Sequence, residues 1–366
     1  MQKFCFIYRI QLLDMKSHMN IVMLRFPHLA EQILQKLDNK GMAKSREVDC
    51  FWEKFIDERD YPWLRIVNIP TVLAKGNTYL HLAAEHGRID PFKMLLPFTA
   101  SRTNDLGETP FLIACSKGRM NIAAMLMKKY YELKIDLTTR DNDGLTGFHL
   151  ACKNGHSEIA EMIMNNSSKL EINLNIKDKR GQTAFHLACM EGHYKIAEII
   201  INKSSKLKID LSTKNNEDST AFHLACFHGQ LEVAKLLMEN SSRLKIDWNG
   251  KKISDTTAFQ LVCLKGHLKI AELIINNSAN LKIDLNMKGG NDGSTAFHLA
   301  CVGGDSAMKM LNSARVVEML IEQSECHKID LTVKDEYGQN GYNVAEYFKN
   351  IEVIKLIKTK VPSLVV

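Results

Sequence analysis

An eleven-residue word recurs along two thirds of this chain and constrains its fold more than any other feature. One copy, TAFHLACMEGH, runs from Thr183 to His193. Close copies begin at Thr146, Thr220, Thr257 and Thr295, and looser copies begin at Thr78, Thr109 and Asn340. From Thr109 to Thr257 the starts lie 37 residues apart, and the next start lies 38 residues further on. A fixed period of this size predicts a stacked array of one supersecondary unit, not a globular fold with a single core.

The residue types in the word predict two short helices per repeat. Thr183 is expected to cap the first helix, because its hydroxyl can accept a backbone N–H of the first turn. Gly192 is expected to end that helix, since glycine adopts a positive φ without steric cost. Beyond Tyr194, the residues Ile196 and Ile200 belong to an apolar stripe at helical spacing. Neither helix can bury its apolar side chains alone, so each repeat needs its neighbours.

The word resembles the ankyrin repeat, whose signature is T-P-L-H-x-A at a spacing of about 33 residues. The resemblance covers residues 73–366, with a C-terminal cap from about residue 338. It implies an all-α solenoid of about eight helix–turn–helix repeats with β-turn fingers between them. It also implies that the histidines at one shared position of the word make structural hydrogen bonds that tie turns together. These are His81, His149, His186, His223 and His298, and Gln260 takes the place in repeat six.

The period is four residues longer than that of the ankyrin repeat, and the excess lies within residues 159–183. Four residues make about one helical turn. A second helix lengthened by up to a turn would therefore keep Ile163 and Leu170 on one stripe. A longer loop is the alternative, because the Asn-Asn-Ser run at 165–167 also suits a helix end. The Lys-Asp-x-x-Gly pattern at 177–181 predicts a β-turn finger.

Two departures from the period are candidates for partner binding. Trp248 lies in the finger before repeat six and has two open interpretations. It contacts a partner, since aromatic residues are enriched at interface hot spots, or it packs against the neighbouring finger. Repeat seven carries eight extra residues at 305–312, which we expect to lie between its two helices, where loops tolerate additions. They form either an idle insertion or a binding loop through Asp305, Met308 and Lys309.

Residues 20–66 do not share the repeat, and their pattern predicts three short helices. Phe26-Pro27 suits a helix start, because proline is tolerated in the first turn. Ile33, Leu34 and Leu37 form an amphipathic stripe, and Trp52 follows Val48 at a spacing of four. The segment is similar to the F-box, which implies binding to the adaptor subunit of a cullin-RING (SCF-type) ubiquitin ligase. The adaptor-binding residues would be Phe26, Pro27, Ile33, Leu34, Leu37 and Trp52. The alternative is a helical cap that covers the open apolar end of the array.

The composition, 45% hydrophobic and 25% charged, is typical of a soluble protein. No apolar run approaches the ~18–20 residues of a membrane span. The net charge of +6 is diffuse, without the basic block or aromatic platform that nucleic-acid binding needs. Residues 1–19 lack a signal-peptide cleavage site, and we expect a poorly ordered extension or a sequence upstream of the true start.

The cysteines and histidines point to structure, not chemistry. Six of the nine cysteines share one position of the word, which predicts small buried hydrophobes and the reduced thiols of the cytoplasm or nucleus. The histidines recur along the array and do not gather at one point. No Cys-x-x-Cys pair, His-Glu-x-x-His helix, phosphate-binding glycine loop or nucleophile elbow occurs. We therefore expect no catalytic activity, no metal site and no cofactor.

What remains is recognition of another protein. The leading hypothesis is a substrate-recognition subunit of an SCF-type ubiquitin ligase. In it, residues 20–66 bind the adaptor and the array of residues 73–366 binds the target. The alternative is a passive ankyrin-repeat scaffold or inhibitor whose N-terminal helices only cap the array.

Overall fold

The computed structural model of the chain describes residues 76–89, 92–93, 96, 101–252, 254–303 and 306–365. Within these ranges every regular element is a helix, and β pairing is limited to two isolated bridges, Lys251–Thr257 and Gly289–Ser294. The described residues fall into two compact units. One contains those up to Ala114 together with Lys128–Asp136, and the other contains Cys115–Met127 and 137–365. The expected all-α fold is confirmed.

Each repeat contributes a first helix that begins directly after the threonine or asparagine of the repeated word. These helices are α6 (Tyr79–His86), α8 (Pro110–Ser116), α10 (Gly147–Lys153), α12 (Ala184–Glu191), α14 (Ala221–Phe227), α17 (Ala258–Lys265), α19 (Ala296–Val302) and α21 (Gly341–Tyr347). The second helices are α9 (Met120–Leu133), α11 (Ser157–Asn166), α13 (Tyr194–Leu207), α15 (Leu231–Glu239) followed by α16 (Ser241–Leu244), α18 (Leu268–Leu281), α20 (Ala307–His327) and α22 (Ile351–Lys360). A final 3₁₀ turn, η3, spans Pro362–Val365.

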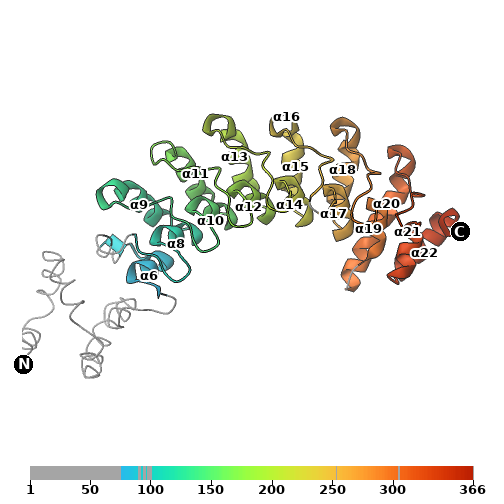
Figure 1. Cartoon of the computed structure of the whole chain (residues 1–366), viewed down its shortest axis with the longest axis horizontal. Coiled ribbons are helices and arrows are strands. Elements are labelled where there is room, and N and C mark those ends of the chain that lie inside the picture. The colour runs from blue at the N-terminus through green and yellow to red at the C-terminus, as the bar shows by residue number, and fades with distance from the viewer. Residues whose placement is uncertain are drawn as a thin grey trace, which may run out of the picture. The chain divides into compact units, whose positions relative to one another are not determined.

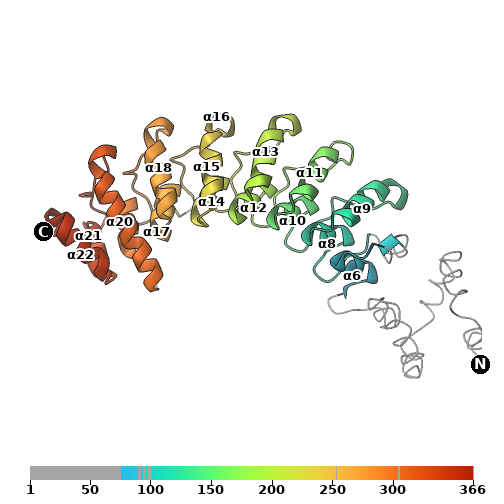
Figure 2. The ribbon, with the colours of Figure 1, turned by 180° about the vertical axis from the view of Figure 1, so that it is seen from behind.

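In the second unit these helices form two layers. The first helices from α10 to α21 pack against one another in chain order, and so do the second helices from α11 to α22. Figures 1 and 2 show the successive pairs side by side, from the green α10 and α11 to the red α21 and α22. Ile196 and Ile200 of α13 are buried, as the stripe predicted. The core therefore runs as a strip between the layers, and each repeat completes the core of the next.

The predicted helix boundaries in repeat four are confirmed. Oγ1 of Thr183 accepts the backbone N–H of His186 at 3.5 Å, and the His186 side chain accepts the backbone N–H of Thr183 in return. Gly192 ends α12 with φ of 80°, in the left-handed region. The same reciprocal cap survives in the last repeat with different residues, because Asn340 and Asn343 exchange the equivalent hydrogen bonds.

The four extra residues of the period lie at the ends of the second helices. In residues 159–183 the favoured lengthened helix is wrong, because α11 ends at Asn166, where the Asn-Asn-Ser run suits a helix end. Lengthened second helices do occur in repeats four and six, where α13 and α18 each contain 14 residues. After α11 the chain makes a separate turn, in which the N–H of Leu170 donates to the carbonyl of Asn166. In repeat five the short α16 follows α15 in the same way. The excess therefore forms helical turns, continuous with the helix in some repeats and separate in others.

Three asparagines link successive repeats at these lengthened ends. Lys208 follows α13 with φ of 53°, and its carbonyl accepts a hydrogen bond from Nδ2 of Asn175 at 2.9 Å. The backbone N–H of Asp210 donates to Oδ1 of the same asparagine at 2.9 Å. Asn249 and Asn286 make the same pair of hydrogen bonds to the repeat that follows each. We call these three side chains the asparagine clamps, and they satisfy carbonyls that a helix end leaves without a partner.

The predicted fingers are β-turns braced by an acidic or amide side chain. Oδ1 of Asp178 accepts the backbone N–H groups of Arg180 and Gln182 at 2.9 and 2.7 Å. Neighbouring fingers pair through their backbones, since the N–H of Asn216 donates to the carbonyl of Arg180 at 3.0 Å. The tips of the fingers are thereby held in fixed register along the second unit.

The prediction that residues 305–312 lie between two helices is wrong for the part that is described. Residues 307–312 are the first turns of α20, a helix of 21 residues whose N-cap is Ser306. The reason is local: Oγ of Ser306 accepts the N–H of Lys309 at 3.4 Å, and no glycine or proline interrupts the sequence that follows. The insertion therefore lengthens a helix at its N-terminal end.

The last repeat carries exposed charged side chains at its end. Lys349, Glu352, Lys355 and Lys358 are exposed. Asn340 binds the end of the chain directly, because its Nδ2 donates to the carbonyl of Leu364 at 2.9 Å. The C-terminal 3₁₀ turn thus closes the apolar end of the last helix pair.

Candidate functional site

In repeats one, three, five and seven a buried histidine ties its own helix to the following finger. The N–H of Thr220 donates to Nδ1 of His223, so Nδ1 carries no proton. Nε2 therefore carries the proton and donates to the carbonyl of Gly250 at 2.8 Å. His81, His149 and His298 make the same links, and at His186 only the Nδ1 half is formed. The implied structural role of these histidines is confirmed.

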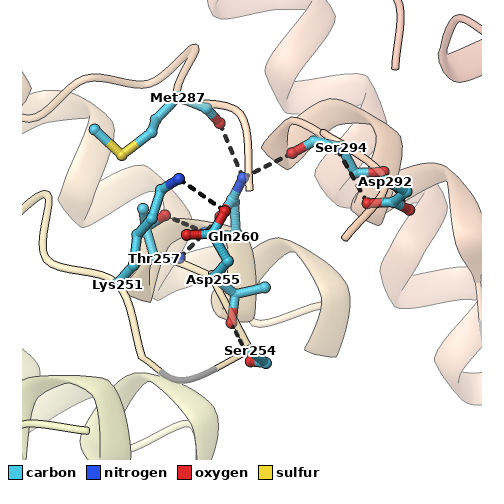
Figure 3. A network of polar contacts seen from close by, with 9 residues as sticks. Lys251, Ser254, Asp255, Thr257, Gln260, Met287, Asp292 and Ser294 are labelled. Carbon is cyan, nitrogen blue, oxygen red and sulfur yellow. Dashed lines mark hydrogen bonds and ion pairs between the residues drawn. The ribbon is translucent and has the colours of Figure 1, made fainter. Parts of the chain in front are cut away.

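Gln260 performs the same task in repeat six with an amide (Figure 3). Its Oε1 accepts the N–H of Thr257 at 2.8 Å. Its Nε2 donates to the carbonyls of Met287 at 2.9 Å and Ser294 at 2.8 Å. Because an amide has two N–H donors, Gln260 satisfies one more backbone carbonyl than the His223 imidazole does.

A second set of histidines lies between the helices of successive repeats. Nε2 of His193 bonds the carbonyl of Lys153 at 3.0 Å. His156 and His267 bond the carbonyls one repeat back in the same way, and Gln230 substitutes for the histidine in repeat five. A Cβ added at Gly155 would lie 2.7 Å from the His193 ring, so glycine is needed there for space as well as for its positive φ.

The titration of the first set follows from burial. Desolvation lowers the pKa of His186 to about 4, and burial likewise lowers the pKa of His149, His223 and His298. Burial also raises the pKa of the six repeated cysteines, among them Cys189 and Cys226, whose side chains are fully buried. These groups are neutral, structural and unsuited to nucleophilic chemistry. No group of three metal-binding side chains occurs among the residues that the structure describes.

The second unit contains an open groove of about 480 Å³. Its finger side includes the exposed tips Lys179, Arg180 and Glu217. Its helix side includes Phe227 from α14 and Met190 from α12, both half-buried. The remaining lining residues are Gln182, Asn215, Asn216, Ser219, His223, Leu224, His228, Lys252 and Leu261. We call this feature the recognition groove.

The recognition groove presents charged tips beside an apolar wall. Lys179, Arg180 and Lys252 are its cationic lining residues, and Glu217 is its one acidic lining residue. Lys265 lies next to it, with Nζ 4.3 Å from the centre of the Phe227 ring. Such a surface can hold a polypeptide by apolar contact and charge together.

The predicted partner-binding residues Trp248, Met308 and Lys309 are not among the residues that line the recognition groove. Trp248 is half-buried, and its ring packs edge-on against that of Phe222 with centroids 4.8 Å apart. It occupies the position of buried leucines such as Leu211 in other repeats. Met308, 67% exposed, and the exposed Lys309 lie on the first turns of α20.

Asp305 and all six predicted adaptor-binding residues lie outside the described residues. These six are Phe26, Pro27, Ile33, Leu34, Leu37 and Trp52.

Sequence reasoning missed the lining of the recognition groove. Lys179 and Arg180 could have been identified by their charge, because the equivalent tips of the neighbouring fingers are the acidic pairs Asn142-Asp143 and Asn216-Glu217. A residue that breaks the period on an exposed turn is not needed by the fold. The contribution of Phe227 and Lys252 depends on how the repeats stack, which the sequence does not state.

The fold and the recognition groove define a helical-repeat interaction scaffold. The protein-family description "Ankyrin repeats (3 copies)" matches residues 61–139, 80–178, 131–212 and 148–251. Together these matches extend over more than half of the chain, and the chain belongs to the ankyrin-repeat family. Ankyrin repeats bind protein partners, so the chain is a protein–protein interaction module. In the described residues no helix has the length and apolar character of a membrane span.

Among solved structures, the chain is similar to the crystal structure of the ankyrin repeat domain of Bcl-3, a unique member of the IkappaB protein family. The two share 20% sequence identity with a TM-score of 0.52, over 68% of this chain and 99% of that chain. At this identity the likeness supports the fold alone. No curated protein matches the chain.

Proposed function

We propose that the recognition groove is the surface through which this chain binds its partner protein. The proposal rests on one observation: the same groove is lined by the exposed cations Lys179 and Arg180 and by the half-buried apolar side chains of Met190 and Phe227. The two cations do not recur with the period of the repeat. Residues that repeat with the period serve the fold, whereas these residues have no structural task that the other repeats share. A concave surface with apolar contacts and a few placed polar groups is the usual form of a binding site.

Site-specific photo-crosslinking tests this proposal. A photoreactive amino acid replaces Phe227 in the full chain, and in a matched variant it replaces Lys235, which is exposed on α15 in the other layer. We expect one partner to be captured from position 227 and not from position 235. Capture from position 235 alone, or equally from both, would reject the recognition groove as the binding surface.

We further propose that the bound protein is the substrate of an SCF-type ubiquitin ligase and that this chain is the substrate receptor. The support is the F-box-like sequence of residues 20–66, with Phe26-Pro27, the Ile33–Leu37 stripe and Trp52. In this arrangement the N-terminal segment binds the adaptor subunit while the recognition groove holds the target. The chain itself performs no catalytic step, and it works in the cytoplasm, where the repeated thiols stay reduced.

Co-purification with the adaptor subunit tests the receptor role. The full chain is compared with Pro27→Ala and Leu34→Asp variants whose helicity is first shown to be unchanged. Retention of the wild type but not of the folded variants is the expected result. If the wild type is not retained either, residues 20–66 are a cap, and the chain is a passive ankyrin-repeat scaffold or inhibitor.

A further inference from the structure

The finger tips of the second unit differ in charge at one place. The tips on either side of the 178–181 finger are Asn142-Asp143 and Asn216-Glu217-Asp218, and the last finger carries Glu336. Between these acidic tips stand Lys179 and Arg180, both exposed. Their backbones make the same turn as the other tips, since Asp178 accepts the N–H of Arg180. The charge of this tip is therefore reversed by its side chains alone, because the backbone of the turn is the same as in the other fingers.

These cations are available to a ligand. Among the described residues, Lys179, Arg180 and Lys252 take part in no ion pair, whereas Lys251 is paired with Asp255 at 2.9 Å. Lys252 lies close enough to His223 to help burial lower the pKa of that imidazole, and Lys214 acts in the same direction. The positive potential thus extends from the exposed tips to the inner side of the recognition groove.

The opposite side of the recognition groove is apolar. Met190, Leu224, Phe227 and Leu261 come from three successive first helices, α12, α14 and α17. One face of Phe227 is covered by the ammonium of Lys265, and its ring contacts that of His228 with centroids 5.1 Å apart. A ligand that fits both sides needs carboxylates for the tips and an apolar side chain for the wall.

We infer that the recognition groove binds an acidic peptide segment that carries at least one large apolar side chain. The inference rests on the proposed function and gives the chemical class of the partner. Carboxylates of the segment lie against Lys179, Arg180 and Lys252, and the apolar side chain lies against Met190 and Phe227. The acidic tips that flank the basic pair limit the length of the acidic stretch, and the basic pair itself disfavours basic segments, since like charges placed together reduce binding.

The same flanking tips disfavour a nucleic acid. A nucleic-acid strand carries one phosphate per residue and needs a continuous basic track. Here Asp143 lies on one side of the basic pair, and Glu217 and Asp218 lie on the other, all exposed. The apolar wall is mostly aliphatic, and the two neighbouring rings of the half-buried Phe227 and the exposed His228 do not form an extended row on which successive bases could stack. A peptide matches this discontinuous pattern better.

A peptide-display selection on the full chain tests the inference. The probe is a random library of short peptides, and the readout is the charge and composition of the enriched sequences. Enriched peptides are then synthesised and their affinity is measured by fluorescence anisotropy against three forms of the chain. These are the wild type, Lys179→Glu/Arg180→Glu, and Lys235→Glu/Lys269→Glu, whose exposed lysines lie on α15 and α18. Both double variants change the net charge by the same amount. A difference in peptide affinity between them therefore depends on where the charges lie.

We expect the enriched peptides to be acidic with a large apolar residue. Reversing the charge of Lys179 and Arg180 should weaken their binding at least tenfold, while the matched Lys235/Lys269 variant changes it less than twofold. Raising NaCl from about 50 to 300 mM should weaken binding to the wild type, because salt screens exposed charges. Replacing Glu by Gln in the peptide should weaken it as well, and a single-stranded oligonucleotide should not compete.

Three outcomes would overturn the inference. The enriched peptides are neutral or basic, the selection enriches no peptide, or the two double variants weaken peptide binding equally. Competition by the oligonucleotide would replace a peptide by a nucleic acid as the ligand. These failures are separable from failure of the proposed function. If the Phe227 photo-crosslink still captures a protein, the recognition groove binds a partner of another chemistry. If that crosslink also fails, the groove is not the binding surface.

Discussion

Two neighbouring repeats solve the same structural problem with different side chains. In repeat five, His223 joins Thr220 to the carbonyl of Gly250 through the two nitrogens of one imidazole. In repeat six, Gln260 joins Thr257 to two carbonyls through one amide. The fold therefore needs a buried side chain that links the first helix to the next finger. This link does not depend on the ability of histidine to bind a proton.

That comparison bears directly on recognition. His223 lines the recognition groove, and the bridge at Gln260 fixes the next finger along the array (Figure 3). Because the bridges hold the fingers in register, the charges at their tips keep fixed positions.

Removing the amide bridge should have the largest effect. Gln260→Leu removes three hydrogen bonds and leaves the N–H of Thr257 and the carbonyl of Met287 without partners, whereas the carbonyl of Ser294 keeps the N–H of Gly289. Each buried orphan group costs ~1–3 kcal/mol. We expect a loss of about 4 kcal/mol in the free energy of unfolding, measured by urea denaturation of the full chain. Gln260→His is the matched control and should cost far less, because histidine makes this bridge elsewhere. Equal losses for the two variants would contradict the bridging role.

Removing the imidazole bridge should cost slightly less. His223→Leu leaves two backbone groups unsatisfied, the N–H of Thr220 and the carbonyl of Gly250, and we expect a loss of about 3 kcal/mol. His223→Gln should recover most of this, since Gln260 shows that the position accepts an amide. Thermal unfolding of both variants checks the expectation. A glutamine variant as unstable as the leucine variant would mean that the two repeats are not equivalent.

A buried imidazole should respond to acid, whereas an amide at the same position should not. Burial lowers the pKa of His186 to about 4 from an ordinary 6.5, so the unfolded chain binds more protons than the folded chain between these values. The stability that neutral His186 contributes is therefore present above pH 6.5 and is lost as the pH falls towards 4. His186→Gln should reduce the loss over this window by up to about 3 kcal/mol. Urea titrations at several pH values test this, and an unchanged pH dependence would refute it.

The smallest effect should come from the asparagine clamps. Asn249→Ala removes two hydrogen bonds to the exposed backbone of the next repeat, and we expect a loss of about 1 kcal/mol. Ser212 stands at the same position one repeat earlier, and its hydroxyl bonds Asp210 within its own repeat. Ser212→Ala is therefore the matched control and should change the free energy of unfolding less. A larger loss at Ser212 than at Asn249 would count against the clamps.

Local features were predictable from the sequence because they depend on residues close together in the chain. Thr183 and Gly192 bound a helix through interactions within one turn, and the repeated cysteines and histidines revealed their burial by sharing one position. The recognition groove was not predictable in this way. Lys179 and Leu261 line it together only because of how successive repeats stack, and the clamps join residues such as Asn175 and Asp210, 35 positions apart.

The insertion in repeat seven shows another limit. Residues 305–312 were placed between helices because of the family period, yet the local signals of a serine cap and an unbroken run of helix formers favoured a longer α20. In that segment, local helix propensity predicts the structure better than alignment to the repeat does.

Hydrogen–deuterium exchange of the full chain, with and without its crosslink-identified partner, tests whether the recognition groove is the binding surface. The account predicts that the partner protects the backbone amides of the 178–181 and 215–218 fingers and of α14. We expect no change in α20 and α21, which carry the exposed apolar side chains Met308 and Tyr347. Protection confined to α20 and α21 would contradict the account and move recognition to the C-terminal end of the array.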